Sequence, residues 1–409
     1  MRDHEQSKKK AAAAKDRPAQ YGTDLDLDQY EFGGSGSNPL EVDSLTDSDR
    51  ALVSQVGFDP EASHAAGAFA QFDNESFLAS VMTLEPGIEV MSIRDAVKKY
   101  EWLSDYFWRA VSVDSDKYTA ASGLNEYNGY FIRAGPGAKI QMPVQSCLII
   151  KKDRLAQNVH NIVIAEEGSE LHVITGCATP GEVERSLHLG ISEFYVKRNA
   201  KLTFTMVHRW SERVDVRPRS ATLVEEGGAF ISSYAVLSPL HSIQTYPKVR
   251  LVGLGARAEL YSVVYGSKSS KYDIGGSLVL DAPGTRGKVV SRTIATDSSD
   301  IVARGDLVGR VNGVKARLEC NGLLLSGTAR IMAIPQLEAS AEGVELSHEA
   351  TVGKLGADQL NYLMSRGLTE DEATSLIVRG FMHLKTPDLP QALQRTIDDA
   401  VRMALESGL

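Results

Sequence analysis

The chain has 409 residues and a formal net charge of -9, with 43% hydrophobic and 24% charged residues. This composition is that of a soluble globular protein with room for two or three domains. The negative net charge argues against a general nucleic-acid-binding protein, because phosphate binding requires a basic face.

Targeting signals are missing from the sequence. The basic N-terminal stretch leads only into AAAA, so the apolar core of a signal peptide is absent, and no later apolar run is long enough for a bilayer. We therefore expect a cytoplasmic protein with neither membrane nor nucleic acid as a partner. Cys147, Cys177 and Cys320 are odd in number and far apart, which indicates reduced thiols rather than a disulfide framework.

The N-terminal part divides into two regions. Residues 1–40 are polar and end in the Gly/Ser-rich run FGGSGSNP, which predicts a flexible arm. Residues 41–130 are expected to form a mixed, partly helical region. Within it, the pattern over 92–111 predicts a helix with Ser92 as its N-cap and with Ile93 and Leu103 on an apolar stripe.

Residues 131–340 consist of short alternating runs separated by glycines, such as NIVIAEEGSELHVITGC and GGSLVLDAPGTRGKVVSRTIA. A period of two places one set of side chains inward and predicts strands. Such evenly spaced strands fit either a large sandwich or a parallel β-helix of stacked turns. Small residues that recur before outgoing strands, such as Gly168-Ser169 and Asn199-Ala200, favour the β-helix.

Residues 341–409 change to a helical period soon after Ala350. Thr369 followed by Glu372 offers a capping box for one helix, and a final helix is expected over 390–408, with apolar residues every four positions. This helical part has little core of its own. It must therefore pack on the β region or on a partner.

Several catalytic motifs fail on inspection. His348 and Glu349 open the run HEAT, but a zinc-protease helix needs a second His where Val352 stands. The chain has neither a G-x-S-x-G elbow nor a GxxxxGK[ST] phosphate loop. A carbohydrate-active enzyme on a β-helix would need clustered carboxylates, whereas Glu166 and Glu225 sit at turn-like boundaries.

Cys320, His348 and Glu349 remain as candidate metal ligands. Thiolate, imidazole and carboxylate together can hold iron or another metal. The alternative is that Cys320 is a buried thiol and that His348 is a hydrogen-bonded core or capping residue. One chain offers too few thiols for a four-cysteine cluster, so such a site would borrow ligands across an interface or leave positions open.

Five blocks between residues 130 and 382 resemble the SufB/SufD family, the scaffold subunits of the SUF iron-sulfur cluster assembly machinery. They are LHVITGCATP, TFTMVHRW, VEEGGAF, LECNGLLLSG and SHEATVGKLGADQLNYLMSRGLTEDEATSLIVRGF. The resemblance implies a mainly β fold, a right-handed parallel β-helix flanked by an N-terminal helical region and a C-terminal helical domain. It also implies a non-catalytic scaffold that holds a transient iron-sulfur cluster, works with the SufC ATPase and passes clusters to apo-proteins.

The resemblance also implies roles for particular residues. Those that would hold the nascent cluster are Cys320, His348 and Glu349. Those that would take sulfur from a donor and line its path are Cys177, His208 and Trp210. Those expected to dock SufC are Leu360, Leu363, Thr369, Ile377 and Phe381. The sequence departs from the SufB pattern at His208, where SufB-type members have Gln, at Glu225, where they have a basic residue, and at Ser347, where they have Glu.

A chain that keeps Cys, His and Glu could pair with itself, and a two-fold interface would duplicate every ligand. We therefore expect a homodimer with two SufC copies, with a SufB/SufD heterodimer as the alternative. The alternative function is a SufD-like structural partner that binds SufC and a SufB-type subunit without holding the cluster. Flavin binding is implied by the resemblance alone, since no residues of the chain argue for it.

Overall fold

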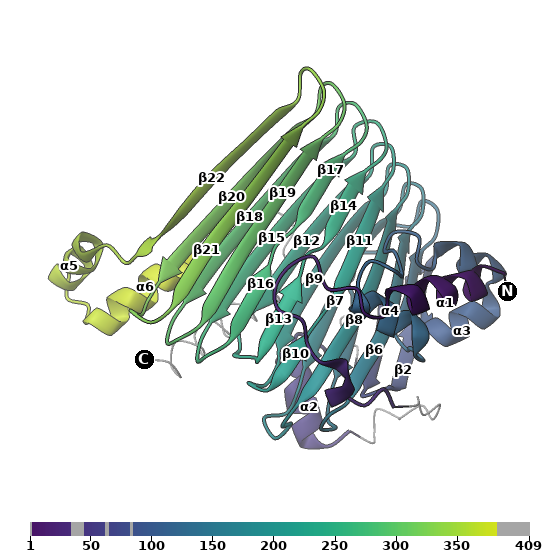
Figure 1. Cartoon of the computed structure of the whole chain (residues 1–409), viewed down its shortest axis with the longest axis horizontal. Coiled ribbons are helices and arrows are strands. Elements are labelled where there is room, and N and C mark those ends of the chain that lie inside the picture. The colour runs from purple at the N-terminus through teal and green to yellow at the C-terminus, as the bar shows by residue number, and fades with distance from the viewer. Residues whose placement is uncertain (1, 34–44, 62–64, 82–84, 383–409) are drawn as a thin grey trace.

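The computed structural model describes residues 2–33, 45–61, 65–81 and 85–382 (Figure 1). Its body is a β-solenoid of about 8 turns with helices at both ends. This confirms the predicted mainly β fold. Within the described ranges, no helix is both long enough and apolar enough to cross a membrane.

The strands form two sheets. In spatial order, the ten-stranded sheet contains β2 (Glu75–Val81), β1 (Gly67–Phe72), β5 (Val144–Ile149), β7 (Glu170–Ala178), β9 (Lys201–Arg209), β12 (Ala229–Val236), β15 (Arg257–Gly266), β18 (Arg286–Ala295), β20 (Lys315–Leu324) and β22 (Glu345–Lys354). The 12-stranded sheet contains β10 (Val214–Val216), β13 (Ser242–Thr245), β16 (Lys271–Ile274), β19 (Asp300–Gly309), β17 (Ser277–Leu280), β14 (Lys248–Leu251), β11 (Arg219–Val224), β8 (Ser186–Val196), β6 (Ala156–Ala165), β4 (Tyr130–Ala134) and β3 (Ile88–Ser92), and β21 (Arg330–Ala339) pairs with β19.

The helices lie at the two ends of the solenoid (Figure 1). On the N-terminal side they are α1 (Arg2–Ala14), η1 (Leu27–Gln29), α2 (Asp47–Ser54), α3 (Ile93–Lys99), η3 (Glu101–Tyr106) and α4 (Lys117–Leu124). On the C-terminal side they are α5 (Ala357–Ser365) and α6 (Glu370–Met382).

Parallel pairing stacks equivalent residues of successive turns. Strands β5 to β22 of the ten-stranded sheet pair in parallel and in register, so residues on the inner face form straight columns along the solenoid. We call each turn of the solenoid a level. Tight loops connect the strands of each level, and in these loops Gly168 and Asn199 adopt left-handed φ values of 68° and 54°, which Gly and Asn tolerate best.

Two of these inner columns carry the residues of functional interest. The Cys320 column runs through Ser146, Thr175, Met206, Tyr234, Ser262, Ser291 and Cys320. The Cys177 column, two positions further along each strand, runs through Leu148, Cys177, His208, Val236, Val264, Thr293 and Gly322. Apolar members of both columns belong to the main buried core, which fills the solenoid.

The C-terminal end of the solenoid is uncovered over much of its last level. Strands β21 and β22 consist mainly of exposed and half-exposed residues, unlike the buried strands before them. The β-helix therefore extends to Lys354 rather than ending at residue 340. The helical period expected soon after Ala350 therefore begins later, because β22 continues to Lys354.

The N-terminal arm, expected to be flexible over 1–40, contains the helix α1. Its Ala11 and Ala14 are buried against Val113 and Ala120, so the alanine run forms a small apolar stripe. Further along, the hydroxyl of Tyr30 donates a hydrogen bond to Asp215 at 2.6 Å. The described part of the arm is thus attached to the solenoid, and residues 34–40 lie outside the described ranges.

The helix predicted over 92–111 is broken into shorter pieces. Ser92 caps α3 as expected, with its side chain accepting a hydrogen bond from the Asp95 backbone N–H. The helical path ends before Trp108, whose φ is 59°. The Glu193 carboxylate accepts backbone N–H bonds from Trp108 and Ala110, each at 2.6 Å, and so holds this segment on the solenoid.

The helix α6 packs on the outer face of the ten-stranded sheet. Its Val378 and Met382 are buried against a cluster that includes Val207 and Ala235. The capping box predicted from Thr369 is present, because its backbone N–H donates to Glu372 at 2.8 Å and its hydroxyl accepts from the Glu372 N–H at 3.2 Å. The helix predicted over 390–408 lies outside the described residues.

Candidate functional site: the solenoid interior and its open end

Cys320 lies on β20 with its side chain directed into the solenoid. It is 2% exposed and pairs in register with Ser291 on one side and Ala350 on the other. Burial, with a smaller contribution from the Glu319 carboxylate, raises the pKa of its thiol to about 11. At neutral pH, Cys320 is therefore a protonated, buried thiol, and it must lose its proton to act as a ligand.

His348 and Glu349 point to opposite faces of β22, because side chains alternate along a strand. His348 pairs with the buried Leu318, so it shares the inner face with Cys320. Glu349 lies on the outer face, where it accepts a hydrogen bond from Arg317 at 2.6 Å. The structure thus brings two of the three predicted ligands to one face and places Glu349 on the other.

A complete metal site is not formed by one chain. Among the described residues, no group of three or more His, Cys, Asp or Glu side chains is arranged to hold a metal ion. Cys320 and His348 are nevertheless within two positions of each other on adjacent strands of the last levels. They provide one sulfur and one nitrogen donor beside the uncovered end, and further ligands would have to come from another molecule.

Cys177 and His208 are direct cross-strand neighbours. They pair in register on β7 and β9 and share the inner face, with exposures of 0% and 1%. Burial raises the pKa of the Cys177 thiol, and burial together with nearby His188 holds the pKa of His208 well below its ordinary range. Both groups are therefore neutral in the resting protein.

Two aromatic residues surround His208. The indole N–H of Trp210 donates to Nδ1 of His208 at 3.0 Å, and the Tyr234 hydroxyl lies 3.3 Å from the same nitrogen. We call Cys177, His208, Trp210 and Tyr234 the sulfur-side cluster. It unites the three residues predicted for sulfur transfer.

Tyr234 was not predicted from the sequence. It belongs to the Cys320 column but contacts His208 of the neighbouring column, so it connects the two. The available signal was its inward position in the alternating run GGAFISSYAVL. That signal becomes specific only when the register between β9 and β12 is known.

A surface hollow opens beside the sulfur-side cluster. Its volume is about 690 Å³, and its lining includes Thr179, Arg209 and Trp210. Thr179 follows directly on the end of β7, two residues beyond Cys177. The buried thiol is therefore separated from the surface by the end of its own strand and the indole of Trp210.

A smaller cavity lies inside the solenoid on the way to Cys320. It measures about 70 Å³, and its lining includes Met206, Tyr234, Ser262 and Ser291, all members of the Cys320 column. Hydroxyl groups and a thioether thus line part of the interior between the two cysteines, among apolar side chains such as Phe204, Phe230 and Leu260. Cys147, by contrast, is buried in a separate cluster on the outer side of the sheet.

The residues predicted to dock a partner on α5 and α6 have different surroundings. Phe381 packs against the cluster on the outer face of the ten-stranded sheet, with the Arg292 guanidinium 5.6 Å from its ring. Leu360, Leu363 and Ile377 are half-buried, and Thr369 caps α6. The exposed apolar side chains of these helices are Tyr362, Met364 and Leu376.

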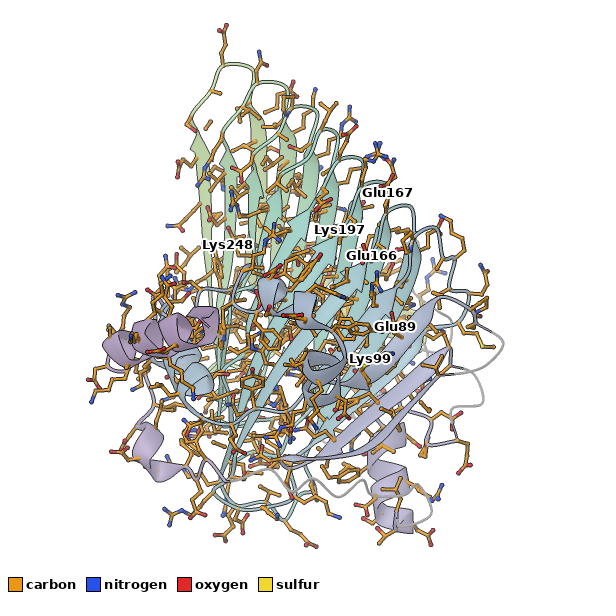
Figure 2. The ribbon with its side chains drawn as sticks, turned by 90° about the vertical axis from the view of Figure 1, so that its right-hand side faces the viewer. Glu89, Lys99, Glu166, Glu167, Lys197 and Lys248 are labelled. Carbon is orange, nitrogen blue, oxygen red and sulfur yellow. The ribbon has the colours of Figure 1, made fainter. Side chains whose placement is uncertain are left out.

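Several acidic residues on the outer surface form ion pairs with Arg and Lys side chains. Figure 2 shows Glu89, Lys99 and Glu166 along one side of the solenoid. Arg133 donates to Glu166 at 2.8 Å and to Glu89 at 3.1 Å. A carbohydrate-active site would need two carboxylates free to exchange protons and attack a sugar, and these pairings do not provide them.

Comparison with known proteins identifies the family of the chain. The family model described as "SUF system FeS cluster assembly, SufBD core domain" matches residues 148–381, more than half of the chain. The chain belongs to the SufBD family. The match includes β7 to β22 and both C-terminal helices, so it contains every candidate site residue of this SufBD protein.

Curated relatives carry the name iron-sulfur cluster assembly SufBD family protein. The one from Methanothermobacter thermautotrophicus strain Delta H is 44% identical over 404 residues, which cover 97% of this SufBD chain and 98% of the relative. The one from Archaeoglobus fulgidus is 47% identical over 357 residues, covering 87% and 95%. A relative from Pyrococcus horikoshii is 32% identical over 377 residues, covering 90% and 84%.

Proposed function

We propose that this chain is a scaffold subunit on which the SUF system assembles iron-sulfur clusters in the cytoplasm before they pass to apo-proteins. The observation that carries the proposal is that Cys320 and His348 face the same side of the last two levels, beside the uncovered end of the solenoid. Cys320 would bind the nascent cluster through its thiolate and His348 through a ring nitrogen.

Sulfur would enter at Cys177 and travel through the interior to Cys320. The two cysteines are separated by five strand-to-strand steps, from β7 through β9, β12, β15 and β18 to β20. At a strand spacing of about 4.8 Å, this path is about 24 Å long. Support comes from the cavity lined by Tyr234, Ser262 and Ser291, whose hydroxyl groups can hydrogen-bond to a passing sulfur species.

The proposed energy source is a SufC-type ATPase, since this chain has no phosphate-binding loop motif and acts as a non-catalytic scaffold. The docking surface would be on α5 and α6, where Tyr362, Met364 and Leu376 expose apolar side chains. Because α6 packs on the outer face of the ten-stranded sheet, movement of the helices could alter access to the last levels.

The missing ligands would be supplied by a second subunit. The open end of the solenoid presents Cys320 and His348 close to the unpaired edge of β22, and a second copy placed there would add the same donors. We therefore propose a homodimer with two SufC copies. A pair with a different SufB/SufD-type subunit is the competing arrangement.

A second candidate function has specific support. The Cys320 thiol is 2% exposed with its pKa raised to about 11, and Glu349 points away from it. These features also suit a SufD-like structural partner, which would bind SufC and a SufB-type subunit while Cys320 remains a buried thiol. The two functions differ in whether the isolated assembly can hold iron.

The deciding experiment is anaerobic reconstitution of the full chain with iron and sulfide, followed by absorption and Mössbauer spectra. A scaffold should acquire cluster features that are lost in Cys320→Ser and reduced in His348→Ala. A wild type that never retains iron would contradict the scaffold function and favour the structural partner. Mass measurement of the purified complex distinguishes the dimers, because a second SufB-like chain would exclude the homodimer.

A further inference from the structure

The hydrogen bonds around His208 fix the tautomer of its ring. An indole N–H can only donate, so Nδ1 of His208 must accept the 3.0 Å bond from Trp210 and cannot carry a proton. The Tyr234 hydroxyl, 3.3 Å from Nδ1, can donate to the same lone pair. Because burial keeps the ring neutral, its single proton lies on Nε2.

This Nε2–H group has no hydrogen-bond partner among the described residues, although it is buried. Buried donors without partners are rare in native proteins, because each forfeits its hydrogen bonds to water. The group shares the inner face with the Cys177 thiol, its register neighbour on a strand about 4.8 Å away. The structure thus places an N–H donor without a partner and a buried sulfur at paired positions of one inner face.

We propose that Nε2–H of His208 is the hydrogen-bond donor that stabilises a persulfide anion on Cys177, with Trp210 as the positioning residue that fixes the tautomer. The inference rests on the sulfur-entry role proposed for Cys177. A persulfide places its outer sulfur about 2 Å beyond Sγ, which extends the side chain within the interior that the two residues share. The neutral thiol needs no such donor, whereas the anionic persulfide does.

The reaction is a thiol–persulfide exchange and needs no oxidant. The Cys177 thiolate attacks the outer sulfur of a donor persulfide, RS–SH, held by a partner protein or a small molecule. A new S–S bond forms at Cys177, the S–S bond of the donor breaks, and the departing RS⁻ takes up the proton that Cys177 lost. The donor would approach through the hollow lined by Thr179 and Trp210, and the Trp210 indole, which separates the hollow from Cys177, would have to move aside.

A second interior histidine, His188 on β8, provides a matched control. Its Nδ1 lies 2.8 Å from the side-chain oxygen of Gln157, and the amide nitrogen of Gln157 is already donating to the Ile149 carbonyl. His188 must therefore donate through Nδ1, which leaves its Nε2 without a proton. His188 is fully buried and neutral like His208, but it cannot donate to an anion through Nε2.

The test measures the persulfide on Cys177 directly. The full chain is incubated anaerobically with glutathione persulfide, freed of excess reagent, alkylated at intervals and analysed by mass spectrometry of the Cys177 peptide. Removing a donor to a charged group should shorten the half-life of the persulfide roughly 10-fold in His208→Leu. His208→Gln, which retains an N–H donor, should stay close to wild type. His188→Leu keeps the His208 donor but removes a ring that lies 5.1 Å from the Trp210 indole, so its half-life should fall much less than that of His208→Leu. Trp210→Phe should give a persulfide half-life between those of wild type and His208→Leu.

Three results would overturn the inference. They are an unchanged half-life in His208→Leu, an equal loss in His188→Leu, and no persulfide at Cys177 in the wild type. Circular dichroism verifies folding, and His208→Gln keeps the test valid if His208→Leu is unstable. Cluster reconstitution at Cys320 with inorganic sulfide bypasses Cys177, so failure there would contradict the scaffold function and leave this inference standing.

Discussion

Leu318 and His348 are register partners on β20 and β22, so the His348 imidazole continues an inner column of the solenoid, while the adjacent Glu349 faces outward to Arg317. This relationship separates two residues that adjacency in the sequence would group together. It makes them unequal candidates for binding the cluster.

The first prediction concerns these two residues in anaerobic reconstitution. His348→Ala should lower the iron retained per chain, because it removes a nitrogen donor from the Cys320 face. Glu349→Gln should retain nearly wild-type iron, since it breaks only an exposed ion pair. Iron and sulfide assays with absorption spectra provide the measurement, and a larger loss in Glu349→Gln would refute the assignment.

The second prediction concerns the reactivity of the Cys320 thiol. A pKa raised from 9.0 to about 11 lowers the thiolate fraction near pH 8 by about 100-fold relative to an unfolded chain. Alkylation of Cys320 should therefore be slow near neutrality and accelerate as the pH rises towards 11. Rates come from mass spectrometry of the Cys320 peptide in native and urea-unfolded protein. Equal rates in both states would contradict this assignment.

The third prediction is that SufC binding to the C-terminal helices changes the reactivity of the Cys320 thiol. If SufC docks on α5 and α6, adding SufC and ATP should accelerate alkylation of Cys320, and the double variant Tyr362→Ser/Leu376→Ser should abolish the acceleration. Lys354→Ser, on exposed β22 outside these helices, is the control and should respond like wild type. A response that persists in the double variant would remove the proposed coupling.

The fourth prediction concerns stability in acid. His188 is buried, and burial lowers its pKa from 6.5 to about 3. Between these two pH values the histidine is protonated in the unfolded chain and neutral in the folded protein. Stability is then fully present above about pH 6.5 and is lost as the pH falls towards 3. When the pH falls from 7 to 5, protonation of this histidine in the unfolded chain should lower the free energy of unfolding by about 2 kcal/mol. Urea titrations of wild type and His188→Leu should show a shallower pH dependence in the variant.

The fifth prediction concerns packing inside the last levels. A Cβ added at Gly305 would lie 2.3 Å from Cδ1 of Leu318, whose side chain is fully buried. Gly305→Ala should destabilise by about 1–3 kcal/mol and Leu318→Ala by about 2–5 kcal/mol. The double variant should lose less than the sum, because alanine at 318 makes room for the new methyl group. Additive losses in urea unfolding would show that the contact is not tight.

The solenoid was predictable from residues 131–340 because the alternation of inner and outer side chains survives in a buried parallel sheet that is closed by regular turns. The extent of the solenoid was not predictable. The last strand, β22, still alternates, with Leu346, Ala350 and Val352 on its inner face, but the inner His348 interrupts the apolar pattern and most of the strand is exposed. The prediction of one helix over 92–111 is wrong for a different reason. The buried Glu193 carboxylate accepts hydrogen bonds from the backbone of Trp108 and Ala110, and these bonds override the local helical pattern.

The site was predictable only in part. Cys320 and His348 were candidate metal ligands from their residue types, the family resemblance added Cys177, His208 and Trp210, and the register then showed which of them face one another. Tyr234 and the contrasting tautomers of two buried histidines could not be found in a single sequence. They depend on which strands are neighbours and on which nitrogen receives each donor.

Pro335 makes the two exposed strand edges at the uncovered end of the solenoid different from each other. In β21, the even-numbered N–H groups point towards β19, as shown by the bonds from Arg330 and Ser340, so Pro335 removes a donor from the free edge. β22 has no proline, and its even-numbered N–H groups, including that of His348, face outward. An incoming strand therefore meets a complete hydrogen-bonding template on one sheet and an interrupted one on the other. Addition of a further strand is therefore hindered at the edge of β21 and is left possible at the edge of β22, beside His348.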